Sequence, residues 1–159
     1  MLELNARRRQ EVLDYLDMRF GIPASLFDRA RFSESAAGEV WVSSETIADA
    51  LIAHRPPGLR ALRRTPTGLK PTSAFLVSIG AAVTRSVVPV DEPSLRLLLL
   101  GRRLPCSAET GYIALSHGGD ILGCGFVADA LMHCLIPTGR RRELLDILGV
   151  GTAPEGPEV

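Results

Sequence analysis

The chain has 159 residues, of which 46% are hydrophobic and 23% charged, and its 18 basic and 18 acidic residues give a formal net charge of zero. This composition is typical of a folded soluble protein of one domain, and no apolar run approaches the roughly 20 residues that a membrane span needs. The first residues mix acids with arginines, unlike a secretory signal, and three cysteines argue against a disulfide framework, so we expect a cytoplasmic protein with no membrane partner.

The zero net charge conceals a basic central segment. Residues 50–142 hold twelve basic and five acidic side chains, and residues 50–90 hold six basic side chains and no acid. A local excess of positive charge attracts phosphate groups, whatever the balance of the whole chain. Seventeen of the 18 basic residues are arginine, so the alternative is a solvated surface that reflects only a composition biased toward arginine.

In chain order, the first predicted element is a helix over residues 6–20. Asn5 can cap it, Gly21 can end it, and its apolar residues recur at three- and four-residue spacing. Short elements are then predicted up to residue 90: a helical turn (24–30), a strand (39–42), a helix from Ser43 or Ser44 to Ala53, a strand or extended basic arm (59–67), a helix that Pro71 starts (71–84) and a strand (86–90).

After residue 90 the pattern changes to short strands at close spacing. The predicted elements are a helix started by Pro93 and closed by Gly101, strands at 104, 111–116, 121–127 and 130–136, and a helix over 141–148. The sequence HGGD at 117–120 is typical of a tight hairpin, because glycine supplies the positive φ that such a turn needs. So few short strands cannot form a large sheet, and we expect them to close into a small barrel.

Together these elements predict an α+β fold in two parts. We expect a mixed α/β subdomain over residues 1–90, a small β-barrel over residues 91–150 and a disordered tail over residues 151–159. Neither part is expected to fold alone, because a barrel of about 65 residues buries little core.

Two basic features are candidate phosphate sites. Lys70, the only lysine, is expected at or just before a helix N-terminus, where backbone amides near Thr72 and the helix dipole favour an anion; the alternative is one lysine surviving in an arginine-rich composition. Arg140, Arg141 and Arg142 are expected on a loop or first helical turn. Positive charge is unfavourable near a helix N-terminus unless an anion lies between the side chains, so this triplet favours a binding role.

Gly123 and Gly125 flank Cys124 inside an apolar strand. Glycine in a strand indicates either a bulge or the close approach of another backbone. A bulge that shapes the sheet and a surface on which an RNA backbone packs are both compatible with this pattern.

Motifs for catalysis or metal binding are not found in the sequence. It has no GxSxG, P-loop or dinucleotide-binding motif. Cys106, His117, Cys124, His133 and Cys134 do not have the paired spacing of zinc ligands. We therefore expect no catalysis by the chain alone, no cofactor and no metal.

Residues 59–142 resemble a known family in the order of their motifs. LLG at 99–101, the glycine run over 119–125 and IPTGR at 136–140 follow the order of PUA domains, the small RNA-binding barrels of pseudouridine synthases, archaeosine transglycosylases and rRNA methyltransferases. A narrower set is similar to the C-terminal RNA-binding extension of the Nop2/Sun family of RNA cytosine-5 methyltransferases: KPT at 70–72, the helix with Phe75 and Gly80, SVV at 86–88, GYIAL at 111–115, LGCG at 122–125 and IPTGRR at 136–141. The methyltransferase domain of that family is missing here.

The resemblance implies RNA binding and gives no support for methyl transfer. In PUA domains RNA lies against the first helix and the glycine-containing strands, which adds Arg102, Arg103 and the two strand glycines to the candidates. The candidate RNA-binding residues are thus Lys70, Thr72, Arg102, Arg103, Gly123, Gly125, Arg140, Arg141 and Arg142.

The expected function is binding of structured RNA, either rRNA or tRNA, in RNA modification or ribosome assembly. The alternative is an accessory module that docks on a separately encoded RNA-modifying enzyme. Trp41, the only tryptophan, is then the candidate anchor.

Overall fold

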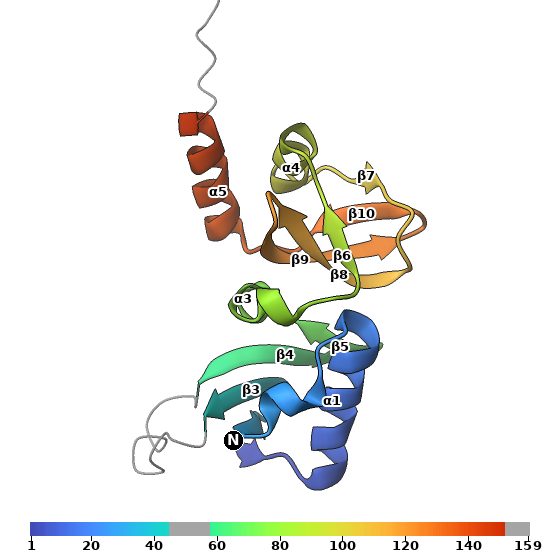
Figure 1. Ribbon diagram of the computed structural model, residues 1–159, viewed down its shortest axis with the longest axis vertical. Helices are drawn as coiled ribbons and strands as arrows, with labels where there is room; N and C mark the ends of the chain where they lie inside the picture. The colour runs from blue at the N-terminus through green and yellow to red at the C-terminus, as the bar shows by residue number, and fades with distance from the viewer. Residues whose placement is uncertain (45–57, 152–159) are drawn as a thin grey trace, which may run out of the picture.

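The structure, a computed structural model, describes residues 1–44 and 58–151. They form an α+β fold with two five-stranded sheets (Figure 1). Ser43 and Ser44 end a strand, and the rest of the helix predicted up to residue 53 lies outside the described residues, as does the predicted tail from residue 152 onward. In the described part of the chain, no helix is long and apolar enough to cross a membrane.

The first sheet is antiparallel, and its strands lie in the order of the sequence: β1 (Leu2–Glu3), β2 (Ala30–Glu34), β3 (Glu39–Ser44), β4 (Leu59–Thr65) and β5 (Gly68–Pro71). Helix α1 (Ala6–Phe20) has the predicted bounds, because Asn5 accepts a hydrogen bond from the Arg8 amide at 2.9 Å and Gly21 ends the helix at φ 64°. The predicted apolar face of α1 is buried in the first core.

The segment after α1 differs from the prediction. Only a short 3₁₀ helix, η1 (Ala24–Phe27), forms there, and the chain then enters β2, which the sequence analysis did not predict. Phe32 in β2 is buried, and its ring lies 5.4 Å from that of Phe27. Phe32 lies opposite Val42 of β3 and both rings belong to the first core, so tertiary contacts override the local helical pattern.

A second difference concerns Pro71, which does not start a helix. It is the last residue of β5 and lies opposite Leu62, on an edge strand that tolerates proline. Thr72 caps the following helix α3 (Ser73–Ser78) by accepting a hydrogen bond from the Phe75 amide, and the 3₁₀ helix η2 (Gly80–Ala82) follows. Lys70 is therefore a strand residue.

The second sheet has the order β6-β8-β9-β10-β7, with β6 parallel to β8 and the other pairs antiparallel. Its strands are β6 (Val87–Pro89), β7 (Leu104–Pro105), β8 (Gly111–His117), β9 (Asp120–Ala128) and β10 (Leu131–Cys134). The sheet is curled (Figure 1), but its edge strands β6 and β7 do not pair in the described residues. The expected closed barrel is thus an open half-barrel.

Two helices complete the second half: α4 (Glu92–Leu99) and α5 (Thr138–Gly151). Both pack on one face of the second sheet, where Leu95 and Leu144 belong to the same core as Ile113 of β8. Helix α5 begins three residues earlier than predicted, so the arginine triplet lies inside its first turns.

A bulge sets the register of the β8–β9 hairpin. Gly118 and Gly119 form the predicted two-residue turn with φ of 59° and 87°. The register then shifts between Leu115 and Ser116, because β9 holds one extra residue at Leu122. Every pair beyond the bulge is displaced by one position.

The two sheets share a core, so the halves are not independent bodies. Helix α3 packs against both β4 and β9, and one cluster of buried residues joins Phe75 to Cys124 of the second sheet. Arg19 of α1 donates hydrogen bonds from Nε to the Tyr112 carbonyl (2.7 Å) and from Nη2 to the Glu109 carbonyl (3.1 Å). Ser86 in turn donates to the Arg19 carbonyl at 2.6 Å.

Candidate nucleic-acid interface

One face of the second sheet carries a row of aromatic side chains, hereafter the aromatic row. Tyr112 of β8 lies opposite Phe126 of β9, which lies opposite His133 of β10. Residues directly opposite one another project from the same face of a sheet. The ring centroids are 4.9 Å apart for Tyr112 and Phe126 and 5.9 Å apart for Phe126 and His133, both edge-to-face, and all three side chains are half-buried.

Two cations, hereafter the cationic flank, lie beside the His133 end of this row. Met132 pairs with Leu104, so the antiparallel register brings Arg103 next to His133. The second cation, Lys70, comes from β5 of the first sheet. Burial, followed by the positive charges of Arg103 and Lys70, lowers the pKa of the His133 imidazole below its usual value. The fold thus brings together two predicted candidates from distant parts of the chain.

The cationic flank is not neutralised within the described chain. Neither Lys70 nor Arg103 forms an ion pair with a described residue, and Arg103 is exposed. Other cations differ: Arg60 pairs with Glu39 at 2.8 Å, and Arg96 pairs with Glu92 at 2.9 Å. Positive charge without an internal counterion is available to an external anion.

Thr72 does not have the free groups that the sequence analysis expected. Its amide donates to the Ala61 carbonyl (2.9 Å), and its hydroxyl donates to the Arg60 carbonyl (2.7 Å) while capping α3. These bonds hold the β5–α3 connection and occupy the amide and the hydroxyl of Thr72. The prediction that Thr72 binds a phosphate is therefore wrong. We leave Thr72 out of the candidate interface and keep Lys70.

Gly123 and Gly125 are packing positions. A Cβ at Gly123 would come within 2.5 Å of Ile136 Cγ1 and 2.9 Å of Ser73 Oγ, and one at Gly125 would lie 3.0 Å from the His133 carbonyl oxygen. Both glycines are buried, and Gly123 lies directly beside the bulge. Close packing within the protein therefore accounts for both glycines, and neither offers a surface to RNA.

The cysteines on β9 and β10 act as packing side chains. Burial raises the pKa of the Cys124 thiol to about 12 and also raises that of Cys134. Both thiols are therefore protonated at neutral pH, which is unlike a reactive cysteine. Among the residues that the structure describes, no group of histidines, cysteines and carboxylates is arranged to hold a metal ion.

The arginine triplet lies apart from the aromatic row. Helix α5 packs in the core on the opposite face of the second sheet from Cys124, which shares the face of the row. Arg140 pairs with Glu143 at 2.8 Å, and Arg141 donates to the Thr138 hydroxyl at 3.0 Å. Arg142 is exposed without an ion pair in the described chain, and Arg102 is likewise exposed next to Arg103.

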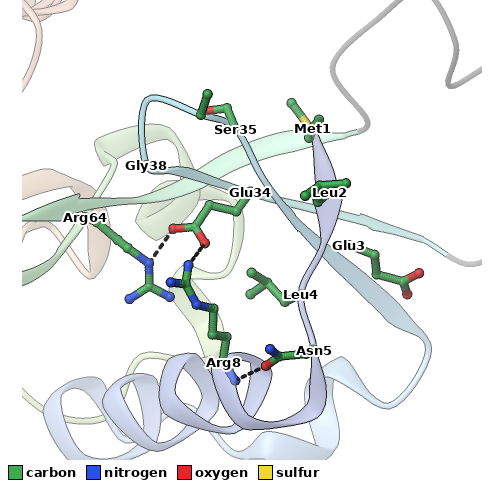
Figure 2. A pocket seen from close by; sticks show the side chains of 11 residues that line it. Met1, Leu2, Glu3, Leu4, Asn5, Arg8, Glu34, Ser35, Gly38 and Arg64 are labelled. Atoms are coloured by element: carbon green, nitrogen blue, oxygen red, sulfur yellow. Dashed lines mark hydrogen bonds and ion pairs between the residues drawn. The ribbon is translucent and has the colours of Figure 1, made fainter.

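A hollow of about 590 Å³ lies beside the N-terminal strand, away from these residues. Figure 2 shows Glu34 at its wall between Arg8 and Arg64. Glu34 accepts a hydrogen bond from Arg8 at 2.6 Å and another from Arg64, which also pairs with Glu11 at 2.9 Å. These charges neutralise one another, so the hollow has no excess charge for an anion.

The fold and the site define an α+β protein with an aromatic and basic sheet face. A family of unknown function (DUF7122) matches residues 3–53, about a third of the chain. No curated protein matches. The family match covers α1, β2 and β3, whereas the resemblance to PUA domains rests on residues 59–142, so the two concern different parts of the molecule.

None of the three members of the aromatic row was predicted from the sequence as a binding residue. Counting back from the predicted HGGD turn without a bulge would put Tyr112 opposite Gly125 and place Phe126 on the other face. The signal that could have located the row is the Gly-Cys-Gly sequence, which indicated a bulge but not its effect on register.

Proposed function

We propose that the protein binds structured RNA, with the cationic flank as its main phosphate contact. The carrying observation is that the register of β7 and β10 brings Arg103 next to His133, and that neither Arg103 nor Lys70, whose charge also acts on His133, forms an ion pair with a described residue. Exposed Arg102 extends this positive region. The excess of seven positive charges over residues 50–142 supports the same proposal. The resemblance to PUA domains supports a role in RNA modification or ribosome assembly.

Filter binding to tRNA or an rRNA fragment at several salt concentrations tests this proposal. Each phosphate contact removed should lower the slope of log K against log salt by roughly one. We expect Lys70→Gln and Arg103→Gln to weaken binding and reduce the slope. Arg7→Gln removes an equal charge at an exposed position of helix α1 and should change RNA affinity and the slope little. Equal effects of all three variants, or no binding at low salt, would contradict the proposal.

A second candidate function is docking on a separately encoded RNA-modifying enzyme. It is favoured by the neighbouring helices α4 and α5, where Leu97 and Ile147 are exposed together with Leu100 at the C-terminal end of α4. Trp41 is a weaker anchor than expected, because its side chain is half-buried and its indole nitrogen is enclosed. Leu100→Lys with Ile147→Lys should abolish RNase-resistant co-purification with an RNA methyltransferase and leave RNA affinity unchanged. Loss of RNA affinity instead would contradict docking through these helices.

A further inference from the structure

The aromatic row supplies a chemistry that the cationic flank does not. Contact with phosphate needs only positive charge, which Lys70 and Arg103 provide. Tyr112, Phe126 and His133 are half-buried residues beside that charge, and the Tyr112 side chain also packs against the first core. An unpaired nucleotide presents a flat π-face and a phosphate close together, so it complements both features at once.

The geometry of the row suits stacking. Its rings come from three adjacent strands, and their centroid separations of 4.9 and 5.9 Å leave them tilted by about 60° to one another. In an edge-to-face pair, the ring that presents its edge keeps both faces clear of that neighbour. A base can therefore stack on such a ring without displacing the next one.

One end of the row is held in place by the first half of the molecule. Arg19 donates to the Tyr112 carbonyl, and a Cβ at the preceding Gly111 would lie 3.0 Å from the Arg19 guanidinium. The backbone that carries Tyr112 is thereby fixed before any ligand arrives. The Tyr112 ring itself packs against the first core and lies edge-to-face with Phe126, so it loses little conformational entropy on binding.

Paired RNA cannot use these rings. In an A-form duplex the bases are stacked on one another, and the helix exposes phosphates and 2′-hydroxyls. We infer that the aromatic row binds the bases of unpaired nucleotides in an RNA loop, bulge or end, with Arg103 and Lys70 on the adjoining phosphates. The inference rests on the proposed RNA binding and names the part of the RNA that is recognised.

The test compares a short unstructured RNA oligonucleotide containing 2-aminopurine with a blunt RNA duplex of the same total length, bound to the full chain. We expect the wild type to bind the oligonucleotide more tightly and to quench its 2-aminopurine fluorescence. Phe126→Leu should weaken that affinity about tenfold and abolish the quenching, and leave duplex affinity unchanged. Phe126→Tyr, which keeps the ring, should retain both.

His117→Leu is the matched control, because His117 is a half-buried ring on β8 outside the row. Thermal unfolding checks that each variant is folded. If folded Phe126→Leu keeps the oligonucleotide affinity, or loses oligonucleotide and duplex affinity equally, the row does not contact bases and the inference fails while RNA binding stands. Competition by polyglutamate as strong as by RNA would also overturn it. If the wild type binds neither RNA at low salt, the proposed function fails as well.

Discussion

Gly123 and Gly125 illustrate how the environment of a residue decides its role. Both stand in a motif that the resemblance to PUA domains connects with RNA, but the hydrogens that replace a Cβ face Ile136 and the His133 carbonyl. The close approach between β9, α3 and the segment after β10 is possible only because glycine has no side chain. The glycines therefore help to shape the sheet on which the aromatic row is displayed.

This role predicts a stability effect for Gly123→Ala. The new Cβ would lie 2.5 Å from Cγ1 of buried Ile136, so the core must shift. We expect the free energy of unfolding in urea to fall by about 1–3 kcal/mol. Gly139→Ala is the control, since its Cβ meets open space in α5 and alanine favours a helix. Unchanged stability of Gly123→Ala together with lost RNA affinity would show that our packing interpretation is wrong.

Among the elements, helices α1 and α4 follow their sequence signals most closely. The bounds of α1 were predicted because its start and end depend on neighbouring residues, Asn5 and Gly21. Helix α4 is likewise capped locally, by Asp91, whose carboxylate accepts a hydrogen bond from the Ser94 amide at 2.9 Å. Local bonds of this kind form wherever the chain context allows them.

The cap of α4 predicts a pH dependence. Hydrogen bonds from Ser94 lower the pKa of Asp91 below its usual value. A carboxyl whose pKa is lower in the folded state stabilises the fold above its unfolded pKa of about 4, and this contribution is lost as the pH falls through the lowered folded value. The loss of stability in Asp91→Ala should therefore be larger at neutral pH than in acid. Urea unfolding of both proteins across this range measures it.

Asp146→Ala serves as the control for this helix cap. Asp146 is an exposed acid in α5 whose removal should change stability little at any pH. If the difference in stability between Asp91→Ala and the wild type is the same in acid as at neutral pH, the carboxylate charge does not contribute to the cap.

At the scale of the whole molecule, the two sheets are joined by a shared core and by the hydrogen bonds of Arg19. We expect a single unfolding transition. Fluorescence of Trp41 in β3 reports unfolding of the first sheet. In a variant whose other two cysteines are alanine, reaction of buried Cys124 in β9 with a thiol reagent reports unfolding of the second sheet. The two midpoints should coincide.

Arg19→Ala tests the coupling between the sheets. It leaves the Tyr112 carbonyl without its charged donor, and we expect a loss of about 1–3 kcal/mol that lowers both midpoints together. A midpoint that moves for Cys124 alone, or two separate transitions in the wild type, would mean that the halves unfold independently.

Much of the fold was accessible from the sequence alone. The α+β class, the bounds of α1, the two-residue turn at Gly118 and Gly119, and Lys70 as a candidate came from local patterns of residues, and Arg103 became a candidate through the resemblance to PUA domains. Caps, turns and charge are properties of a few neighbouring residues, and they are therefore legible in the order of the chain.

Only the tertiary structure decided which residues meet. The bulge at Leu122 shifts β9 by one position and so puts Phe126 on the same face as Tyr112. Pairing with β3 turned residues 30–34 into a strand, and pairing with β4 made Pro71 the last residue of β5 instead of the first residue of a helix. The physical reason is that register and sheet pairing depend on contacts between segments distant in sequence, for which no local pattern carries the information.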